Sequence, residues 1–466
     1  MQIPVLNGIY TDENSDFRTS YPKNLIPVPK ENGISSGYLR PADGIELFGS
    51  GPGVDRGGIN WNGSYFRVMG TKLVKILSNG THIEIGDVGG SEQVTFDYSF
   101  DYLAVASDGS LYLYDNTTLQ KVVDPDLGYV KDVIWVDGYF MTTDGDYIVV
   151  TELGDPFSVN PLKYGSSEVN PDKINAILKL RNEAYVINRY TIEVFDNTGG
   201  ANFPFQRING AQIERGSIGT HTACIFANNI AFIGGALNES NSIWLGNNGG
   251  TTKISTREID QILQEYTEDQ LSKVVVETKL DKSNQHLFIH LPDKTIVFDA
   301  FASQAIGQPI WFILSSSLVG TSKYRARNFV YCYDKWLCAD PTSTKHGILV
   351  DNVSSHYGDV VGWEFGTQIV YNSGNGAIFH EIELIALTGR VQLGLNPTIW
   401  TSWSEDGETF SQEFAIQAGK IGQRNIRLSW IRQGVMQHWR IQKFRGTSDA
   451  HMSIARLEAR IEGLSN

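Results

Sequence analysis

Seven basic residues and no acidic residue lie in the 28 positions from Gly419 to Gly446. Arginine outnumbers lysine by five to two, and its planar guanidinium group makes paired hydrogen bonds with carboxylates and phosphates. The basic residues are Lys420, Arg424, Arg427, Arg432, Arg440, Lys443 and Arg445, with Trp430, Trp439 and Phe444 between them. This pattern predicts a β-hairpin with an arginine-rich face. Such a face binds an acidic protein surface or DNA phosphates, unless it is only a solvated strand face.

The residues Ser404, Asp406, Gly407, Thr409 and Phe410 nearly match the Asp-box, a turn motif of sialidase propellers. The match lacks the residue between Asp and Gly, and it occurs once. Sialidase chemistry also needs three convergent arginines and a Tyr/Glu pair, which the sequence does not single out. We therefore interpret this motif as a plain β-turn and predict no catalytic residue in it.

Other patterns lack residues that a cofactor or metal site requires. The glycine-rich segment 246–253 ends in a lysine but misses the adjacent Gly-Lys-Ser/Thr of a phosphate-binding loop. Gly51-x-Gly53 opens no βαβ unit, which excludes a dinucleotide site. His290 lies on an alternating, strand-like run, so we predict no metal site there. The sequence therefore predicts a protein that is not an enzyme and has no metal and no cofactor.

Composition and charge indicate a turn-rich β protein. The 466 residues include 47 Gly, 20 Tyr and 22 Phe but only 5 Met, and the net charge of −14 disfavours general attraction to nucleic acid or to an acidic membrane. Residues 380–466 carry 10 Lys+Arg and 9 Asp+Glu, whereas residues 1–379 carry 28 Lys+Arg and 43 Asp+Glu. The excess of acidic residues therefore lies in residues 1–379. Three cysteines give no disulfide framework and favour synthesis in a reducing compartment. The N-terminus does not resemble a signal peptide, and no apolar run approaches the roughly 20 residues of a membrane span.

Hairpin-like segments recur along the chain. The predicted turn pairs are Asn62-Gly63, Asn79-Gly80, Gly89-Gly90 and Asp108-Gly109, and among them Asn-Gly and Asp-Gly suit two-residue hairpins. Seven segments align on Tyr65, Tyr102, Tyr139, Tyr185, Ala231, Leu287 and Trp336, with spacings of 37, 37, 46, 46, 56 and 49 residues. A four-stranded propeller blade needs roughly 40–50 residues. We therefore predict a propeller-like body of six or seven units; the alternative is an ordinary antiparallel β domain.

Three regions follow from this pattern. Residues 1–50 are predicted to be an extended, Pro-rich segment that lies on another surface, because prolines cannot donate a regular ladder. Residues 51–379 form the propeller-like domain, with a short helical insertion at 256–273 that starts its second helix at a Thr267–Gln270 capping box. The insertion is either a lug between two blades or a cover for a sheet edge. Residues 380–466 are predicted to be an antiparallel β-sandwich, in which 453–463 forms a strand although its pattern also fits a helix.

Two blocks of sequence resemble one family. Ser35-Ser36-Gly37-Tyr38-Leu39-Arg40 and Gly44-Ile45 follow an Asn-Leu-x-Pro phrase, and Ile289-His290-Leu291-Pro292 precedes Phe298-Asp299-Ala300. These blocks are similar to the packaged-DNA stabilisation proteins, also called tail accessory factor, tail hub or nozzle, of short-tailed lambdoid-type phages (podoviruses). Outside them the resemblance is one of pattern.

The resemblance implies a structural protein of the virion tail, synthesised in the host cytoplasm. It implies a homo-oligomeric ring, a hexamer in the family, that docks below the portal and its adaptor ring, retains packaged DNA, carries a tail needle and tailspikes, and later forms part of the channel for double-stranded DNA ejection. An acidic channel wall would keep DNA from adhering. Tyr38 and Arg40 join the seven basic residues as candidate interface residues. The alternative function is a glycan-binding or sialidase-like β-propeller.

Overall fold

The computed structural model describes residues 1–11, 17–30, 37–200, 202–282 and 284–464; Ser35 and Ser36 of the family-like phrase lie outside them. Two compact units are present, which we describe separately. The propeller unit comprises Leu47–Pro292 and Arg325–Ile348. The sandwich unit comprises Met1–Glu46, Asp293–Tyr324 and Leu349–Asn466. The predicted boundaries at residues 50/51 and 379/380 stay a prediction. Among the described residues, no helix is long and apolar enough to span a membrane.

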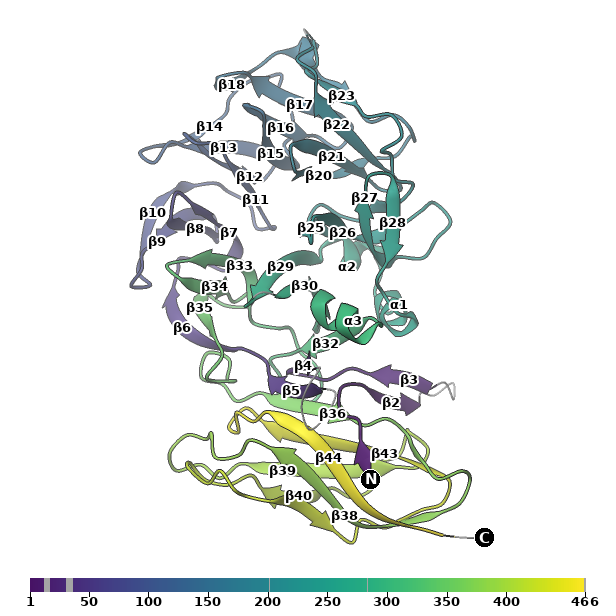
Figure 1. The fold of residues 1–466 in the computed structure, drawn as a ribbon. Coiled ribbons are helices and arrows are strands. Elements are labelled where there is room, and N and C mark those ends of the chain that lie inside the picture. Colours follow the sequence, from purple (N-terminus) through teal and green to yellow (C-terminus); the bar gives the residue numbers. More distant parts are fainter. Residues whose placement is uncertain (12–16, 31–36, 201, 283, 465–466) are drawn as a thin grey trace. The chain divides into compact units, whose positions relative to one another are not determined.

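Consecutive antiparallel sheets build the propeller unit (Figure 1). The first sheet contains β7 (Asp55–Trp61), β8 (Ser64–Met69), β9 (Lys72–Ile76) and β10 (His82–Asp87). The second contains β11 (Thr95–Tyr98), β12 (Leu103–Ser107), β13 (Ser110–Tyr114) and β14 (Leu119–Lys121). The third is β15 (Asp132–Val136), β16 (Tyr139–Thr143), β17 (Tyr147–Glu152), β18 (Asp155–Val159), with β19 (Gly165–Ser166) and a 3-10 turn at Pro161–Lys163 beside it. The fourth sheet contains β20 (Ile174–Leu180), β21 (Glu183–Asn188), β22 (Ile192–Asn197) and β23 (Phe205–Arg207). The fifth contains β24 (Gly216–Ser217), β25 (Ala223–Phe226), β26 (Asn229–Gly235), β27 (Ser242–Asn247) and β28 (Gly250–Lys253).

The unit continues with the hairpin of β29 (Val275–Asp281) and β30 (Asn284–His290) and with β33 (Arg327–Cys332), β34 (Lys335–Ala339) and β35 (Lys345–Val350). Each of the seven aligned residues lies on, or directly before, the strand that follows the opening strand of its sheet. Tyr65, for example, lies on β8 and Trp336 on β34. The structure therefore confirms the predicted repeat.

Two of the four predicted turn pairs form two-residue hairpins. Asn62-Gly63 joins β7 to β8, and Asp108-Gly109 joins β12 to β13, with all four residues at positive φ. The prediction of a two-residue hairpin was wrong for Asn79-Gly80, and none was made for Gly89-Gly90. Asn79-Gly80 lies in a longer loop between β9 and β10, where only the glycine has positive φ. Gly89-Gly90 lies between β10 and β11, which belong to different sheets.

Hydrophobic packing between neighbouring sheets holds the unit together. One cluster joins Phe66 and Val68 of the first sheet to Leu103 and Val105 of the second. Similar clusters join the second to the third sheet, the third to the fourth and the fourth to the fifth. A further cluster packs residues 330, 332 and 337 of the β33–β34 hairpin against residues 65, 69, 74 and 76 of the first sheet. The last sheet of the unit thus packs on the first, as a closed propeller requires.

The helical insertion contains α1 (Arg257–Gln264) and α2 (Glu268–Ser272). α1 buries Ile259 and Leu263 and contacts β27. The predicted capping box of α2 is confirmed, because Thr267 and Gln270 exchange side-chain to backbone hydrogen bonds. A third helix, α3 (Ala300–Ile306), was not predicted. Its N-cap is Asp299, whose carboxylate accepts from Ala302 N at 2.9 Å.

Two sheets face each other in the sandwich unit. One has the order β4-β5-β44-β38-β41, with β1 beside β44 and β42 beside β38; the other has the order β36-β43-β39-β40, with β37 beside β43. The first contains β1 (Gln2–Ile3), β4 (Leu25–Pro29), β5 (Gly37–Pro41), β38 (Ala377–Ala386), β41 (Leu428–Ile431), β42 (Val435–Met436) and β44 (Ile454–Gly463). The second contains β36 (Gly362–Gly366), β37 (Val370–Tyr371), β39 (Thr398–Ser404), β40 (Phe414–Gln417) and β43 (Trp439–Thr447). The strand over 454–463 and the predicted β-sandwich are confirmed.

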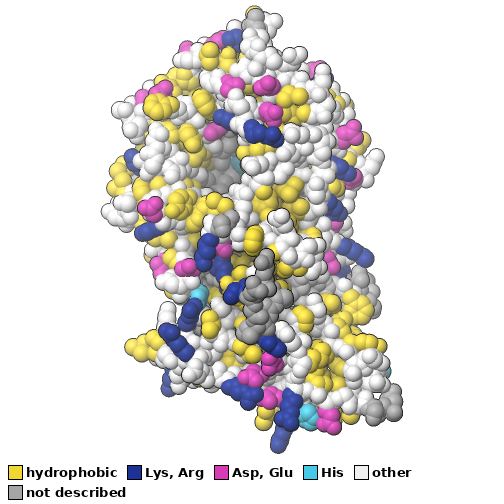
Figure 2. All heavy atoms as spheres, viewed as in Figure 1, with side chains coloured by type: hydrophobic (Ala, Val, Ile, Leu, Met, Phe, Trp, Pro, Cys, Tyr) yellow, Lys and Arg dark blue, Asp and Glu magenta, His cyan; other side chains and the backbone are white. Residues whose placement is uncertain are grey.

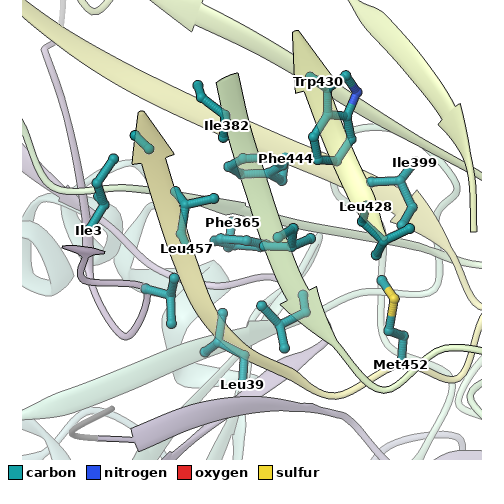
Figure 3. Packing of buried hydrophobic residues seen from close by; sticks show 14 of the residues in the cluster. Ile3, Leu39, Phe365, Ile382, Ile399, Leu428, Trp430, Phe444, Met452 and Leu457 are labelled. Carbon is teal, nitrogen blue, oxygen red and sulfur yellow. The ribbon is translucent and has the colours of Figure 1, made fainter. Parts of the chain in front are cut away.

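The remaining strands are β2 (Gly8–Thr11), β3 (Phe17–Ser20), β31 (Thr295–Asp299) and β32 (Ile310–Leu314), while β6 (Gly44–Ser50) and β35 each cross a boundary between the two units along the chain. The core of the sandwich unit is shown in Figure 3. Ile382 and Leu457 of one sheet pack with Phe365 and Phe444 of the other. Ile3 and Leu39 belong to the same cluster, so N-terminal strands complete the core that the C-terminal strands build.

The expectation that the Pro-rich N-terminal segment makes no regular ladder is wrong for β4. Residues 25–29 of β4 pair in continuous register with residues 37–41 of β5 although Pro27 and Pro29 lie in β4. β4 is the outermost strand of its sheet. The two prolines are two residues apart, so they face the same way along the strand, and an edge strand tolerates missing N–H groups on its open side.

Candidate functional site

The basic segment 419–446 does not form the predicted hairpin. β41 and β42 pair with β38, whereas β43 pairs with β36, β37 and β39 in the opposite sheet. Arg432 and Gly434, both at positive φ, turn the chain between β41 and β42, and it then crosses to the second sheet. Both strands were recognisable from their local pattern, but their partners lie far away in sequence. Of the seven cations, Arg440, Lys443 and Arg445 therefore lie on β43, and the other four lie in loops before and after β41.

Three of these cations are paired within the sandwich unit. Arg427 contacts Glu381 at 3.0 Å and Glu383 at 2.7 Å. Lys443 lies 2.8 Å from a Glu364 oxygen. Arg445 makes two 2.6 Å hydrogen bonds to Glu413, and its guanidinium carbon lies 4.5 Å from the Trp400 ring centroid. In the view of Figure 2, basic and acidic side chains lie near one another on this part of the molecule.

Arg440 belongs to the core and cannot be an exposed docking residue, which corrects the expectation for this position. It is 1% exposed, and its guanidinium carbon lies 4.3 Å from the ring centroids of both Phe379 and Trp403. Nε and Nη2 donate to Gln442 Oε1 at 3.1 and 2.8 Å, and Nη1 donates to the Gln433 carbonyl. Burial lowers the pKa of Arg440.

The remaining three cations, Lys420, Arg424 and Arg432, are exposed. No side-chain hydrogen bond or ion pair of these three is found within the described part of the chain. Of the two N-terminal candidates, Tyr38 is half-buried with Lys30 Nζ 5.7 Å from its ring centroid. Arg40 is half-buried and pairs with Asp43 at 3.1 Å. The candidate interface residues therefore do not form one site; their role in docking stays a prediction.

The Asp-box-like residues form a turn between β39 and β40, as interpreted from the sequence. Asp406 Oδ1 accepts from Ser404 Oγ at 2.7 Å, from Glu408 N at 2.9 Å and from Thr409 N at 2.8 Å. Oδ2 accepts from Thr409 Oγ1. These hydrogen bonds hold the pKa of Asp406 well below its usual range. The carboxylate is fully engaged in shaping its own turn.

The other chemical candidates also have structural roles. The glycine-rich segment 246–253 turns at Asn248-Gly249, both at positive φ, between β27 and β28. His286 and His290 have an H-x-x-x-H spacing but lie on a strand, where His290 Nε2 lies 2.7 Å from Glu277 Oε1. Across the residues that the structure describes, no group of three or more His, Cys, Asp or Glu side chains is placed to hold a metal ion.

A buried polar network in the propeller unit was missed by the sequence analysis. Arg67 Nε donates to Asp55 Oδ1 at 2.7 Å, and both side chains have no exposed surface. Glu277 accepts from the backbone N–H groups of Asn328 and Phe329 at 2.8 and 2.7 Å. Asp55 and Arg67 lie on β7 and β8, far in sequence from Glu277 on β29 and Asn328 on β33, so no local pattern could have linked the two pairs.

Acidic residues are concentrated in one part of the propeller unit. Residues 84–155, which extend from β10 to β18, contain 15 Asp+Glu against 2 Lys+Arg. Eight of the acidic side chains are exposed: Glu84, Asp87, Glu92, Asp101, Asp108, Asp115, Asp146 and Asp155. Of these eight, Asp87 and Asp146 have an ion-pair partner among the described residues. This acidic stretch, residues 84–155, accounts for most of the net charge of the chain.

Comparisons with known proteins cover both units. Two family models match: residues 1–354 match "Bacteriophage P22 Gp10, beta-propeller", and residues 362–462 match "Bacteriophage P22 Gp10, beta-sandwich". The chain is 29% identical over 483 aligned positions to the "Tail hub protein gp10" of Salmonella phage P22, covering 99% of each chain.

Similar solved structures include the computationally designed Ika8 protein, with 13% identity and a TM-score of 0.38 over 75% of this chain and 98% of that one. The WD40 domain of Neurospora crassa Pan2 has 8% identity and a TM-score of 0.41, over 66% and 95% of the two chains. Both TM-scores are below 0.5, so neither similarity carries an argument. The family models, by contrast, match well over half of the sequence. The chain belongs to the bacteriophage P22 Gp10 family, with that family's β-propeller followed by its β-sandwich.

Proposed function

We propose that this chain is a structural tail hub protein of a short-tailed phage. The observation that carries the proposal is the similarity to the P22 tail hub protein, which extends over 99% of both chains and includes both units. In this role the chain assembles as a ring below the portal and its adaptor ring, and we expect the ring to contain six copies. The ring retains the packaged DNA, carries the needle and tailspikes, and forms part of the ejection channel.

Two structural features support a scaffolding role rather than catalysis. The near Asp-box is a turn whose carboxylate is held by four hydrogen-bond donors of the same turn. The buried charged pair Asp55–Arg67 links strands of the propeller unit and has no exposed surface. We therefore propose that the chain has no enzymatic activity and that a glycan-directed function does not apply.

The test uses particles of the encoding phage assembled without this chain. We expect these particles to lose packaged DNA, and we expect purified chain added to them to restore nuclease-resistant DNA and infectivity. Particles that keep their DNA and infect normally without the chain would refute the proposed role. Incubation of the purified chain with sialosides and host surface polysaccharide should give no release of sugar.

A further inference from the structure

A cavity of about 690 Å³ lies in the sandwich unit among four loops, at residues 351–360, 389–392, 421–424 and 448–451. Arg390 and Arg424 line it together with Val360 and Ile421. Val360 is 42% exposed and Ile421 is 52% exposed. Leu393, in the same loop as Arg390, is 86% exposed. The cavity therefore combines two cationic side chains with accessible apolar surface, which is the composition of a protein interface rather than of a solvated loop region.

Neither arginine of this cavity has a hydrogen-bond or ion-pair partner for its guanidinium group among the described residues. This separates them from Arg427 and Arg445, which are paired with glutamates of their own unit. Two guanidinium groups that face one cavity can each make a bidentate contact with a carboxylate. Of the predicted basic residues, Arg424 thus lies at this cavity, beside Arg390, which the sequence analysis did not single out.

The acidic stretch, residues 84–155, supplies the complementary chemistry. It has 15 acidic against 2 basic residues, and most of its exposed carboxylates have no ion pair within the described chain. Two copies of this chain therefore present opposite charges: unpaired arginines at the cavity of one and unpaired carboxylates on the propeller unit of the other. A contact between two different surfaces of identical copies is heterologous, which is the kind of contact that builds a ring when the rotation between copies closes.

We infer that the cavity of one copy binds the acidic stretch of a neighbouring copy. The inference deepens the proposed function and rests on it, since it assigns a contact within the proposed ring. DNA is a poorer occupant, because the exposed apolar side chains of Val360 and Ile421 match apolar side chains of a protein better than a sugar-phosphate backbone. A carboxylate beside an apolar side chain on the neighbouring copy would complement both the arginines and the apolar residues that line the cavity.

The first experiment compares two double variants that lose the same charge. Arg390→Ser/Arg424→Ser removes the two cavity arginines, and Arg427→Ser/Arg460→Ser removes two arginines of the same unit that do not line the cavity. All four residues are exposed, so both variants should melt within a few degrees of the parent chain. Incorporation into particles assembled without the chain is then measured. We expect the cavity variant to require about tenfold or more protein than the control variant, because hydrogen bonds to charged groups are lost.

The second experiment identifies the occupant. A photo-crosslinking benzoylphenylalanine replaces Ile421 in the cavity, or Ile431, which is 64% exposed and lies outside the cavity, as control. In assembled particles we expect a crosslink from position 421 to another copy of the chain, within residues 84–155, and none of this kind from position 431.

Three results would overturn the inference: equal incorporation of the two double variants, crosslinks from position 421 only to DNA or to a different virion protein, or no crosslink above the control. In each of these cases the parent chain still enters the particle. Failure of the parent chain itself to enter would instead refute the proposed function, so the two failures are distinguishable.

Discussion

Asn328 donates a hydrogen bond from Nδ2 to Asp55 Oδ2 at 2.6 Å, although 273 residues separate the two in sequence. Asp55 begins β7 in the first sheet of the propeller unit, and Asn328 lies on β33 in its last sheet. The other carboxylate oxygen of Asp55 binds Arg67. One buried carboxylate thus connects the beginning and the end of the unit, next to the hydrophobic cluster that packs the same sheets together.

Replacing Asp55 with Ala should destabilise the propeller unit. The change leaves the Arg67 guanidinium buried without its carboxylate and removes the acceptor of Asn328, and breaking a buried ion pair costs about 3–5 kcal/mol. Urea unfolding followed by circular dichroism measures the loss. Asp101→Ala, at an exposed position, is the control and should change the unfolding free energy by less than about 0.5 kcal/mol. A loss below 1 kcal/mol for Asp55→Ala would show that the pair does not hold the unit closed.

Asp132 should make stability depend on pH. Burial raises the pKa of this carboxyl from 3.8 to about 7, although Ile177 N and Val133 N donate to it at 2.8 and 3.0 Å. Because the folded-state pKa lies above the unfolded one, its contribution to stability is fully present below about pH 4 and is lost as the pH rises through 7. The largest possible change is about 4 kcal/mol, from roughly three pKa units.

Asp132→Asn isolates this effect from the other titrating groups, because Asn does not ionise. Compared with the parent chain, the variant should lose less stability between pH 4 and pH 8 when melting is followed by calorimetry. Asp101→Asn, in which the replaced carboxylate is exposed, should follow the parent curve. Parallel pH profiles for the parent and Asp132→Asn would contradict the assignment.

Replacing Arg440 with Ala should lower the free energy of unfolding rather than weaken binding to a partner. The substitution removes a side chain stacked between Phe379 and Trp403 and leaves the Gln433 carbonyl and Gln442 Oε1 without their donor. We expect a loss of about 2–4 kcal/mol, typical of large-to-small changes in a core. Arg424→Ala, on the exposed loop, should change the melting temperature little. Equal melting curves for the two variants would mean that Arg440 is not a core residue.

Local patterns predicted the repeating architecture well. The aromatic and aliphatic residues at Tyr65, Tyr102 and Tyr139 mark corresponding strands because strand propensity and turn chemistry act over a few residues. Asn62-Gly63 and Asp108-Gly109 likewise form the expected turns, since both residues of each pair adopt positive φ. The short helix at Asp299 was missed because an Asp side chain that accepts a backbone N–H serves a turn and a helix N-cap alike.

The sequence did not predict which distant strands pair with each other. The strands around Trp430 and Phe444 were recognised, yet they belong to opposite sheets, since the register of β41 is set by β38 and that of β43 by β36 and β39. The burial of Arg440, which lies on β43, depends on that same arrangement. Charge counts along the sequence therefore suggested one basic face, whereas the structure divides the basic residues into paired, buried and free ones.

Cryo-electron microscopy of virions of the encoding phage tests the tail hub assignment most directly. The account predicts a ring of density below the portal and adaptor into which the propeller unit and the sandwich unit each fit once per subunit, with six subunits expected. Mass spectrometry of the same particles should detect this chain. Particles whose tail lacks both units, or a chain found outside the tail, would contradict the account.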